Sequence, residues 1–193
     1  MPEPARMSGM LFSAAVSWIK STYGNELFEK VMSILTETER NQFRKLILSI
    51  GWYDIVLFEK FCTLCYNEIS KISQESRESF DRRGIEEGGG SMLKTVYKFF
   101  LSMTDPLSVL SRMPVLFKRT FSQGEMTVVQ NTPGVCTIRF NVPFEMYETI
   151  DRNIKYGYPY LLRLSGAKEV FTEKKEVKEA NSYLIIAEIY YKQ

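Results

Sequence analysis

The spacing of apolar residues changes near Gly124, and this change constrains the fold more than any other feature of the sequence. Before it, apolar residues recur every three or four positions, as in Ile55, Phe58, Cys62, Cys65, Ile69 and Ile72. After it they alternate, so that Cys136, Ile138, Phe140 and Val142 point to one side. The first spacing is typical of helices and the second of half-buried strands. Helices followed by strands predict an α+β fold.

The spacing of apolar residues also predicts where the individual helices and strands lie. Thr36 and Glu39 form a capping-box pattern at the start of one of the helices. We expect helices near residues 10–19, 27–35, 36–50, 55–72, 91–103, 106–121 and 159–165, and strands within 126–142, with a turn at Asn131–Gly134, and at 168–177 and 182–191. This predicts one domain over 1–193, with a helical part at 8–122 and, at 123–193, a small four-stranded antiparallel sheet with a packed helix.

Charge and hydropathy exclude some kinds of partner. The 193 residues hold 25 Lys and Arg against 23 Asp and Glu, a net charge of +2, and the two signs are interleaved. Such a chain lacks the basic patch that nucleic-acid binding requires. The apolar run Met10–Ile19 is too short to span a bilayer and lacks the flanks of a signal peptide. We therefore expect no membrane span and a cytoplasmic location.

The chain contains no histidine. That absence removes the Ser-His-Asp triad, the Cys-His dyad, the commonest metal ligand and the usual axial ligand of heme. We expect a protein that is not an enzyme, with no catalytic residues, no metal site and no cofactor.

Three consecutive glycines precede the segment Ser91–Thr95 and together give GGGSMLKT, which resembles a phosphate-binding loop. Such a loop needs a glycine directly before its lysine, but Leu93 precedes Lys94, and the polar stretch before the glycines has no strand character. The sequence favours a backbone role for Gly88, Gly89 and Gly90 instead. They would let a helix start, with Ser91 as its cap, or let two helices pass at close range.

Cys62 and Cys65 form a CxxC pattern in the middle of a predicted helix rather than at a helix N-terminus, where a redox pair normally lies. The two residues fall on the apolar stripe, so we interpret them as small core residues. Metal binding, and acylation of a thiol that faces an internal pocket, remain as alternatives.

Three segments in order resemble an uncharacterised protein family that is expanded in myxobacteria. They are GWYD (Gly51–Asp54), the long stretch from Arg82 to Met126, and YGYPYLLRLSGAKEV (Tyr156–Val170). In that family a Trp-Tyr-Pro step opens one helix, whereas this chain has Asp54 in place of the proline. The similarity extends from about Phe12 to the end of the chain, and it rests on the order of the motifs.

That family in turn resembles a wider structural group. The group contains heme-nitric-oxide/oxygen-binding (H-NOX) domains, 4-vinyl-reductase-type sensor domains and the small subunits of TRAPP tethering complexes. The resemblance implies helices followed by a four-stranded antiparallel sheet, as the apolar spacing also predicts. H-NOX domains bind heme through a proximal histidine and a Tyr-x-Ser-x-Arg motif. Neither is present here, so heme binding of that type is excluded.

Two functions follow from the resemblance. The first is a heme-free sensor that binds a small apolar molecule or lipid in an internal cavity. Its lining would come from Trp52, Phe61, Cys62, Tyr97, Phe100 and Phe117, with Met103 and Phe121 nearby. These side chains could equally be ordinary core. The second is an interaction or scaffold subunit, similar to those of TRAPP, that pairs as a homodimer or with another protein.

Overall fold

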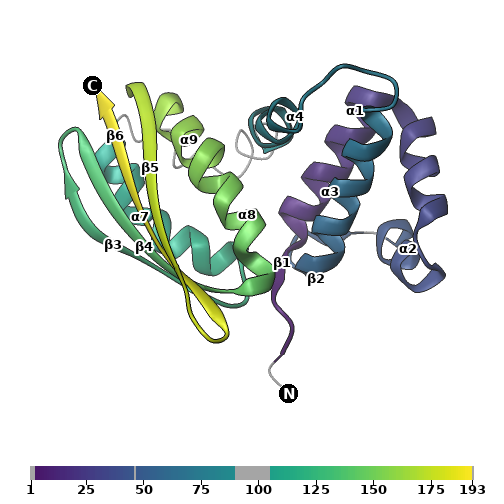
Figure 1. Cartoon of the computed structure of the whole chain (residues 1–193), viewed down its shortest axis with the longest axis horizontal. Coiled ribbons are helices and arrows are strands. Elements are labelled where there is room, and N and C mark those ends of the chain that lie inside the picture. The colour runs from purple at the N-terminus through teal and green to yellow at the C-terminus, as the bar shows by residue number, and fades with distance from the viewer. Residues whose placement is uncertain (1–2, 46, 90–104, 193) are drawn as a thin grey trace. The chain divides into compact units, whose positions relative to one another are not determined.

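The computed structural model describes residues 3–45, 47–89 and 105–192 (Figure 1). The chain forms two compact units, Met1–Met92 and Leu93–Gln193. The sequence placed the boundary near residue 122. The structure instead packs the helix α7 (Pro106–Thr120) on the first strand of the sheet, β3 (Glu125–Thr132), so α7 belongs to the second unit.

The first unit is mainly helical, as predicted. Its elements are β1 (Arg6–Ser8), α1 (Gly9–Ile34), α2 (Glu37–Arg44), β2 (Trp52–Asp54), α3 (Ile55–Ile69), α4 (Arg77–Arg83) and the π-helical turn η1 (Gly84–Gly89). The two predicted helices at 10–19 and 27–35 are parts of α1, which breaks at Gly24, where φ is +88°. The predicted capping box at Thr36 and Glu39 is confirmed at the start of α2.

The helix predicted over 36–50 is wrong beyond Arg44, where α2 ends. The chain turns there and returns as β2, which pairs antiparallel with β1, and neither strand was predicted. The Gly9 amide donates to the Gly51 carbonyl oxygen at 2.8 Å. A Cβ on Gly9 would lie 2.1 Å from the Leu48 carbonyl oxygen, so this turn requires a glycine beside it. Ile50, which was expected on the buried stripe, is 89% exposed.

The helix α3 begins directly after β2. The Asp54 carboxylate accepts hydrogen bonds from the Val56 and Leu57 amides at 2.8 and 3.3 Å. Asp54 is therefore the N-cap of α3. The helix ends at Ile69, three residues earlier than predicted, and Ile72 is 76% exposed.

The second unit combines α7 with a four-stranded antiparallel sheet and a helical connection. The sheet consists of β3, β4 (Val135–Pro143), β5 (Lys168–Lys178) and β6 (Ser182–Lys192) in the order β3-β4-β6-β5. The helical connection after β4 contains η2 (Phe144–Met146), α8 (Tyr147–Arg152), η3 (Asn153–Gly157) and α9 (Tyr158–Leu164). The sequence predicted the strands and α9 but missed the helical turns before α9.

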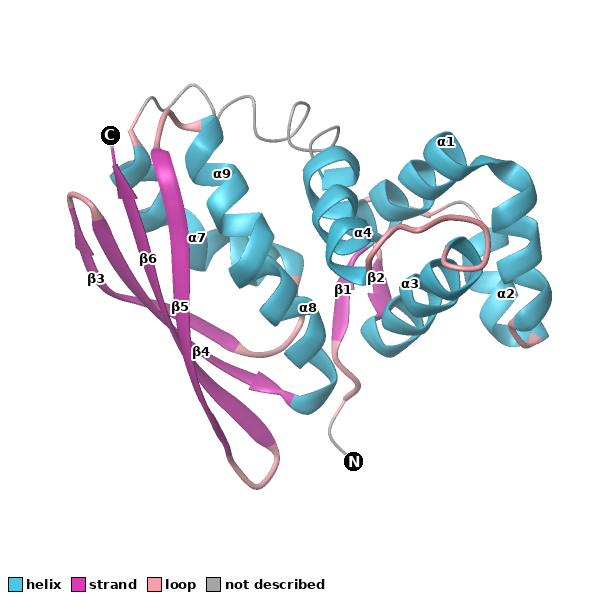
Figure 2. Ribbon diagram, turned by 45° about the horizontal axis from the view of Figure 1, so that its top comes forward, coloured by secondary structure: helices cyan, strands magenta, loops and turns pink. Residues whose placement is uncertain are grey.

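The alternation along β4 is confirmed. Cys136, Ile138, Phe140 and Val142 are buried on one face of the sheet. The helices α7, α8 and α9 lie on that side, and among the described residues of this unit, 105–192, no helix lies on the other side of the sheet (Figure 2). Gly166, with a φ of +96°, ends α9 and leads into β5. Within the described ranges, no helix combines the length and the hydropathy that crossing a membrane requires.

Candidate functional site

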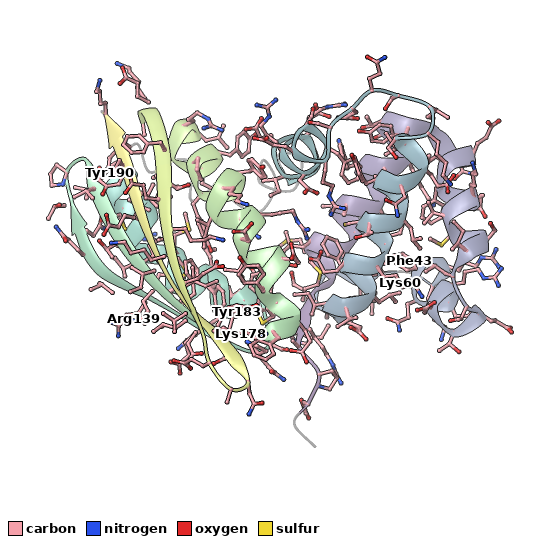
Figure 3. The ribbon with its side chains drawn as sticks, viewed as in Figure 1. Phe43, Lys60, Arg139, Lys178, Tyr183 and Tyr190 are labelled. Carbon is pink, nitrogen blue, oxygen red and sulfur yellow. The ribbon has the colours of Figure 1, made fainter. Side chains whose placement is uncertain are left out.

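Of the predicted lining residues, Phe61 is the most completely buried in the first unit. It lies on α3 with no exposed surface, and its ring centroid is 4.8 Å from that of Phe43 and 6.2 Å from that of Phe28. Phe43, labelled in Figure 3, also contacts Phe12 at 4.9 Å. Cys62 follows Phe61 on α3 and is half-buried. The aromatic rings around Phe61 therefore form the core between α1, α2 and α3.

Trp52 does not join that core. It lies on β2 opposite Ser8, and 44% of its surface is exposed. Phe117 is buried in the second unit, where its ring lies 5.1 Å from that of Phe121 and 6.1 Å from that of Phe140. Tyr97 and Phe100, together with Met103, fall outside the described residues. The structure thus places Phe61 and Cys62 side by side along one helix and Phe117 in the core of the other unit.

Sequence reasoning missed a charged cluster in the second unit, in which Lys174 on β5 meets three oxygen-bearing side chains. Its ammonium group donates hydrogen bonds to the Asp151 carboxylate and, at 2.9 Å, to the Tyr147 hydroxyl. It also forms an ion pair with the Glu176 carboxylate at 2.8 Å. The Tyr147 hydroxyl donates to Glu176 at 2.7 Å, and Lys155 pairs with Asp151 at 2.7 Å. Asp151 is only 7% exposed. These bonds hold the helical connection against β5.

The interactions within this cluster favour a protonated Lys174, an ionised Asp151 and a neutral Tyr147. Burial alone would lower the pKa of Lys174, but its bonds to Asp151, Glu176 and Tyr147 outweigh burial and raise the pKa. Burial raises the pKa of Asp151, and the hydrogen bonds from Lys155 and Lys174 more than reverse this, so its pKa is lowered. Burial also raises the pKa of Tyr147. A cationic lysine, an ionised aspartate and a neutral phenol are poor proton carriers near pH 7.

One sequence signal for this cluster existed. Asp151 and Lys155 are four residues apart, the spacing of a helical ion pair. The sequence does not predict a helix over this segment, so the spacing of Asp151 and Lys155 could not be interpreted as an ion pair. Lys174 belongs to the mixed-charge run Lys168–Ala180, in which the sequence does not distinguish a buried lysine from an exposed one.

A second charged cluster, in the first unit, joins η1 to α1. The Glu87 carboxylate accepts from the Trp18 indole at 3.0 Å and from Arg83 at 2.9 and 3.2 Å. Arg83 also donates to Glu75 at 3.1 Å, and Glu75 accepts from the Tyr23 hydroxyl at 2.8 Å. The hydrogen bond from Arg83 lowers the pKa of Glu87, and burial raises that of Tyr23. This cluster anchors η1 and offers no activated base.

The glycines of η1 explain the first part of the GGGSMLKT segment. A Cβ on Gly88 would lie 3.0 Å from the Trp18 Cβ and 3.2 Å from its Cγ, whereas one on Gly89 would meet no atom within 4 Å. The close approach predicted for the glycines is therefore confirmed at Gly88. Gly90, Ser91 and Lys94 lie outside the described residues.

The three cysteines are free thiols. Cys65 and Cys136 are buried, and Cys62 is half-buried. Burial raises the pKa of the Cys65 thiol, and it raises that of Cys136 to about 12. In the part of the chain that the structure describes, no three or more Cys, Asp or Glu side chains gather in a way that could hold a metal ion.

Comparison with known proteins gives a likeness of structure. No protein-family model matches the chain, and no curated protein matches its sequence. An Fe(II) unliganded H-NOX protein from K. algicida is similar with a TM-score of 0.69 and 13% identity, over 97% of each chain. An oxygen-binding H-NOX domain related to soluble guanylate cyclases, in its oxygen complex, is similar with a TM-score of 0.71 and 9% identity, over 97% of this chain and 96% of that one.

A mutant of T. tengcongensis H-NOX gives a TM-score of 0.70 and 11% identity, over 97% of this chain and 98% of that one. Sequence identities this low establish the fold and nothing finer. The likeness spans both the helical first unit and the sheet of the second, in the order that the apolar spacing predicted. The chain therefore has an H-NOX-like fold.

Proposed function

We propose that this protein is a heme-free sensor module that binds a small apolar molecule or lipid. One observation carries the proposal: the likeness to H-NOX structures covers 97% of the chain, yet the chain has no histidine. An H-NOX-like fold without the imidazole that ligates iron in H-NOX domains is suited to a different occupant. We further propose that the chain belongs to the myxobacterial family that its motif order resembles.

The cysteines support the heme-free part of the proposal. Besides imidazole, cysteine thiolate, methionine and tyrosine can serve as protein ligands of heme iron. Cys65 and Cys136 are buried among apolar side chains, and burial raises the pKa of both thiols, which disfavours the thiolate. Heme held through an imidazole, or through the thiolate of Cys65 or Cys136, does not fit this chain, and no step of the proposed function passes through iron.

We also propose that the protein is not an enzyme, on the basis of the charge states of its ionisable groups. The two charged clusters hold Lys174, Arg83 and the carboxylates around them as ion pairs, and the phenols of Tyr147 and Tyr23 as neutral groups. General acid–base catalysis at neutral pH needs a group whose pKa lies near 7. The perturbed groups of both clusters are shifted away from that range.

We retain Trp52, Phe61, Cys62, Tyr97, Phe100 and Phe117 as proposed ligand contacts. Cys62 is the best position for a test, because it is half-buried beside the fully buried Phe61. A large side chain at position 62 would compete with a ligand that contacts this part of α3. Thr63, the next residue on α3, is exposed and serves as a matched position for a control.

The experiment is native mass spectrometry of the purified protein, before and after extraction with organic solvent. We expect an extra mass that extraction removes, and a higher melting temperature when the extract is added back. The variant Cys62→Phe should lose the extra mass, and Thr63→Phe should keep it. A wild-type protein that carries no extra mass would contradict the proposal.

An interaction subunit is the second candidate, and exposed apolar side chains favour it. Phe171 and Val177 on β5 are 55% and 60% exposed, and strand register places them on the sheet face opposite to α7, α8 and α9. The same mass spectra separate the two functions. An apo protein that forms a dimer or captures a partner supports the interaction subunit, whereas a bound small molecule supports the sensor.

A further inference from the structure

The uncovered face of the sheet carries its side chains in a regular pattern. We call the face of β3, β4, β5 and β6 that points away from α7, α8 and α9 the outer face (Figure 2). Strand register places Glu173 of β5 opposite Glu188 of β6. Two residues further along β5, Lys175 lies opposite Ile186 of β6, and Ile186 also pairs with Arg139 of β4. An acidic row therefore lies next to a basic row on the outer face.

An apolar row borders the charged rows at each end. Phe171 pairs with Tyr190, and their rings stack at 4.8 Å. At the other end Val177 pairs with Leu184. Along the strands the outer face thus reads apolar, acidic, basic, apolar. A small hollow between the two charged rows is lined by Glu173, Lys174, Lys175, Ile186 and Glu188.

Within one copy of the described chain, the charged side chains of these two rows form no ion pair. Glu173 and Glu188 are like charges directly opposite each other, an arrangement that destabilises a sheet. The hydroxyl of Tyr190 donates to Glu188, and this bond raises the pKa of Tyr190 to about 12. In the described ranges the side chains of Arg139 and Lys175 form no hydrogen bond or ion pair, and both residues are exposed. Arg139 and Tyr190 are labelled in Figure 3.

We propose that the outer face binds the outer face of a second copy of this chain, about a twofold axis that lies parallel to the face and across the strands. This axis reverses the order of the rows. The acidic row of one copy then lies over the basic row of the other, with Glu173 over Lys175 twice in the interface. Phe171 lies over Val177, and Tyr190 lies over Leu184. A twofold axis along the strands would instead place acidic on acidic.

The pattern fits the general geometry of such an interface. A twofold interface requires a patch that is complementary to itself, and a sequence of rows that reads apolar, acidic, basic, apolar has this property. Face-to-face sheets pack with their strands nearly aligned. Four strands about 4.8 Å apart, each roughly 30 Å long, offer on the order of 600 Å² per copy, somewhat below the usual ~800 Å² per partner. We therefore expect a dimer that dissociates on dilution.

This inference goes beyond the sensor proposal and holds whether or not a small molecule is bound. Sedimentation velocity over a range of concentrations tests it on the full chain. Glu173→Lys and Lys175→Glu should each weaken the dimer at least about tenfold, because each variant places like charges together twice. The double variant, with both substitutions, restores opposite charges and should recover an affinity near that of the wild type.

The control is Glu148→Lys, which makes the same charge change on α8, at an exposed position on the helix side of the sheet. It should leave the dimer unchanged. Loss of the dimer through unfolding can be distinguished by the melting temperature. Glu173→Lys removes the repulsion from Glu188, so it should not lower the melting temperature of the monomer. A monomeric wild type, a dimer that both single variants leave intact, or a double variant that fails to recover each overturns the proposal.

Discussion

Gly88 shows how a single residue can set the distance between two elements. Its missing Cβ lets η1 lie against the Trp18 side chain, while the Trp18 indole donates to Glu87 on the same turn. Gly89, the next residue, faces open space and has no positive φ. The two neighbours therefore have opposite requirements, although the sequence presents them as equivalent members of one run.

Replacing each glycine with alanine tests this difference. Gly88→Ala should lower the free energy of unfolding by about 1–3 kcal/mol, because the new methyl group presses on Trp18. Gly89→Ala should raise it by roughly 0.4–1 kcal/mol, because alanine reduces the freedom of the unfolded chain without a clash. Urea unfolding followed by tryptophan fluorescence measures both values. Equal effects at the two positions would contradict the packing of Gly88 on Trp18.

The three cysteines should differ in reactivity. Cys62 is half-buried, whereas Cys65 and Cys136 are buried with raised thiol pKa values. We expect iodoacetamide to modify Cys62 first under native conditions, and the other two only after denaturation. Mass spectrometry of tryptic peptides over time gives the order. Early modification of Cys65 would show that the core of the first unit is open at α3.

At the scale of elements, α8 and β5 are joined by Asp151 and Lys174. Asp151 lies on a short helical segment, and Lys174 lies 23 residues later on an edge strand. The lowered pKa of Asp151 means that its ionised form stabilises the folded state. That contribution is present above the usual aspartate pKa of 3.8 and is lost as the pH falls below it.

Asp151→Asn should therefore lower the free energy of unfolding by about 1–3 kcal/mol at pH 7, since it removes the charge that Lys174 and Lys155 contact. The difference from the wild type should shrink as the pH falls from 4 toward 2. Glu148→Gln, on the exposed side of the same helix, is the control and should have little effect at any pH. A loss that is equal at pH 7 and at pH 2 would show that Asp151 contributes by shape and not by charge.

Elements that bury one face were predictable from the sequence, and elements fixed by distant contacts were not. The strand β4 follows from Cys136, Ile138, Phe140 and Val142, because burial on one side of a sheet imposes alternation. The strands β1 and β2 are three residues each, too short to show a period. The turn before β2 depends on Gly9, whose amide donates a hydrogen bond to the carbonyl oxygen of Gly51, a residue distant in the sequence.

The predicted ligand contacts illustrate a second limit. Periodicity marks Phe61 and Phe117 as inward-facing, and both are buried. It does not distinguish the lining of a cavity from the packing of a core, because both use the same residue types at the same spacing. Trp52 was predicted to line the cavity as one of the aromatic side chains, and its exposed position on β2 depends on the pairing with β1.

At the scale of the whole molecule, the sequence and the structure agree on helices followed by an antiparallel sheet, and the structural relatives are H-NOX domains. The absence of histidine separates this chain from heme chemistry through imidazole. The fold without that ligand is the basis of the proposed sensor, and the outer face of the sheet is the basis of the proposed dimer. The two proposals depend on different residues and can fail independently.

A titration of the purified protein with hemin, followed by visible absorbance, tests the heme-free claim most directly. Iron held by a protein ligand shifts and sharpens the Soret band of hemin, and the shift saturates when the sites are full. We predict a spectrum that changes in proportion to added hemin, without saturation, because no imidazole is present to bind the iron. A saturable Soret shift at one hemin per chain would contradict the account.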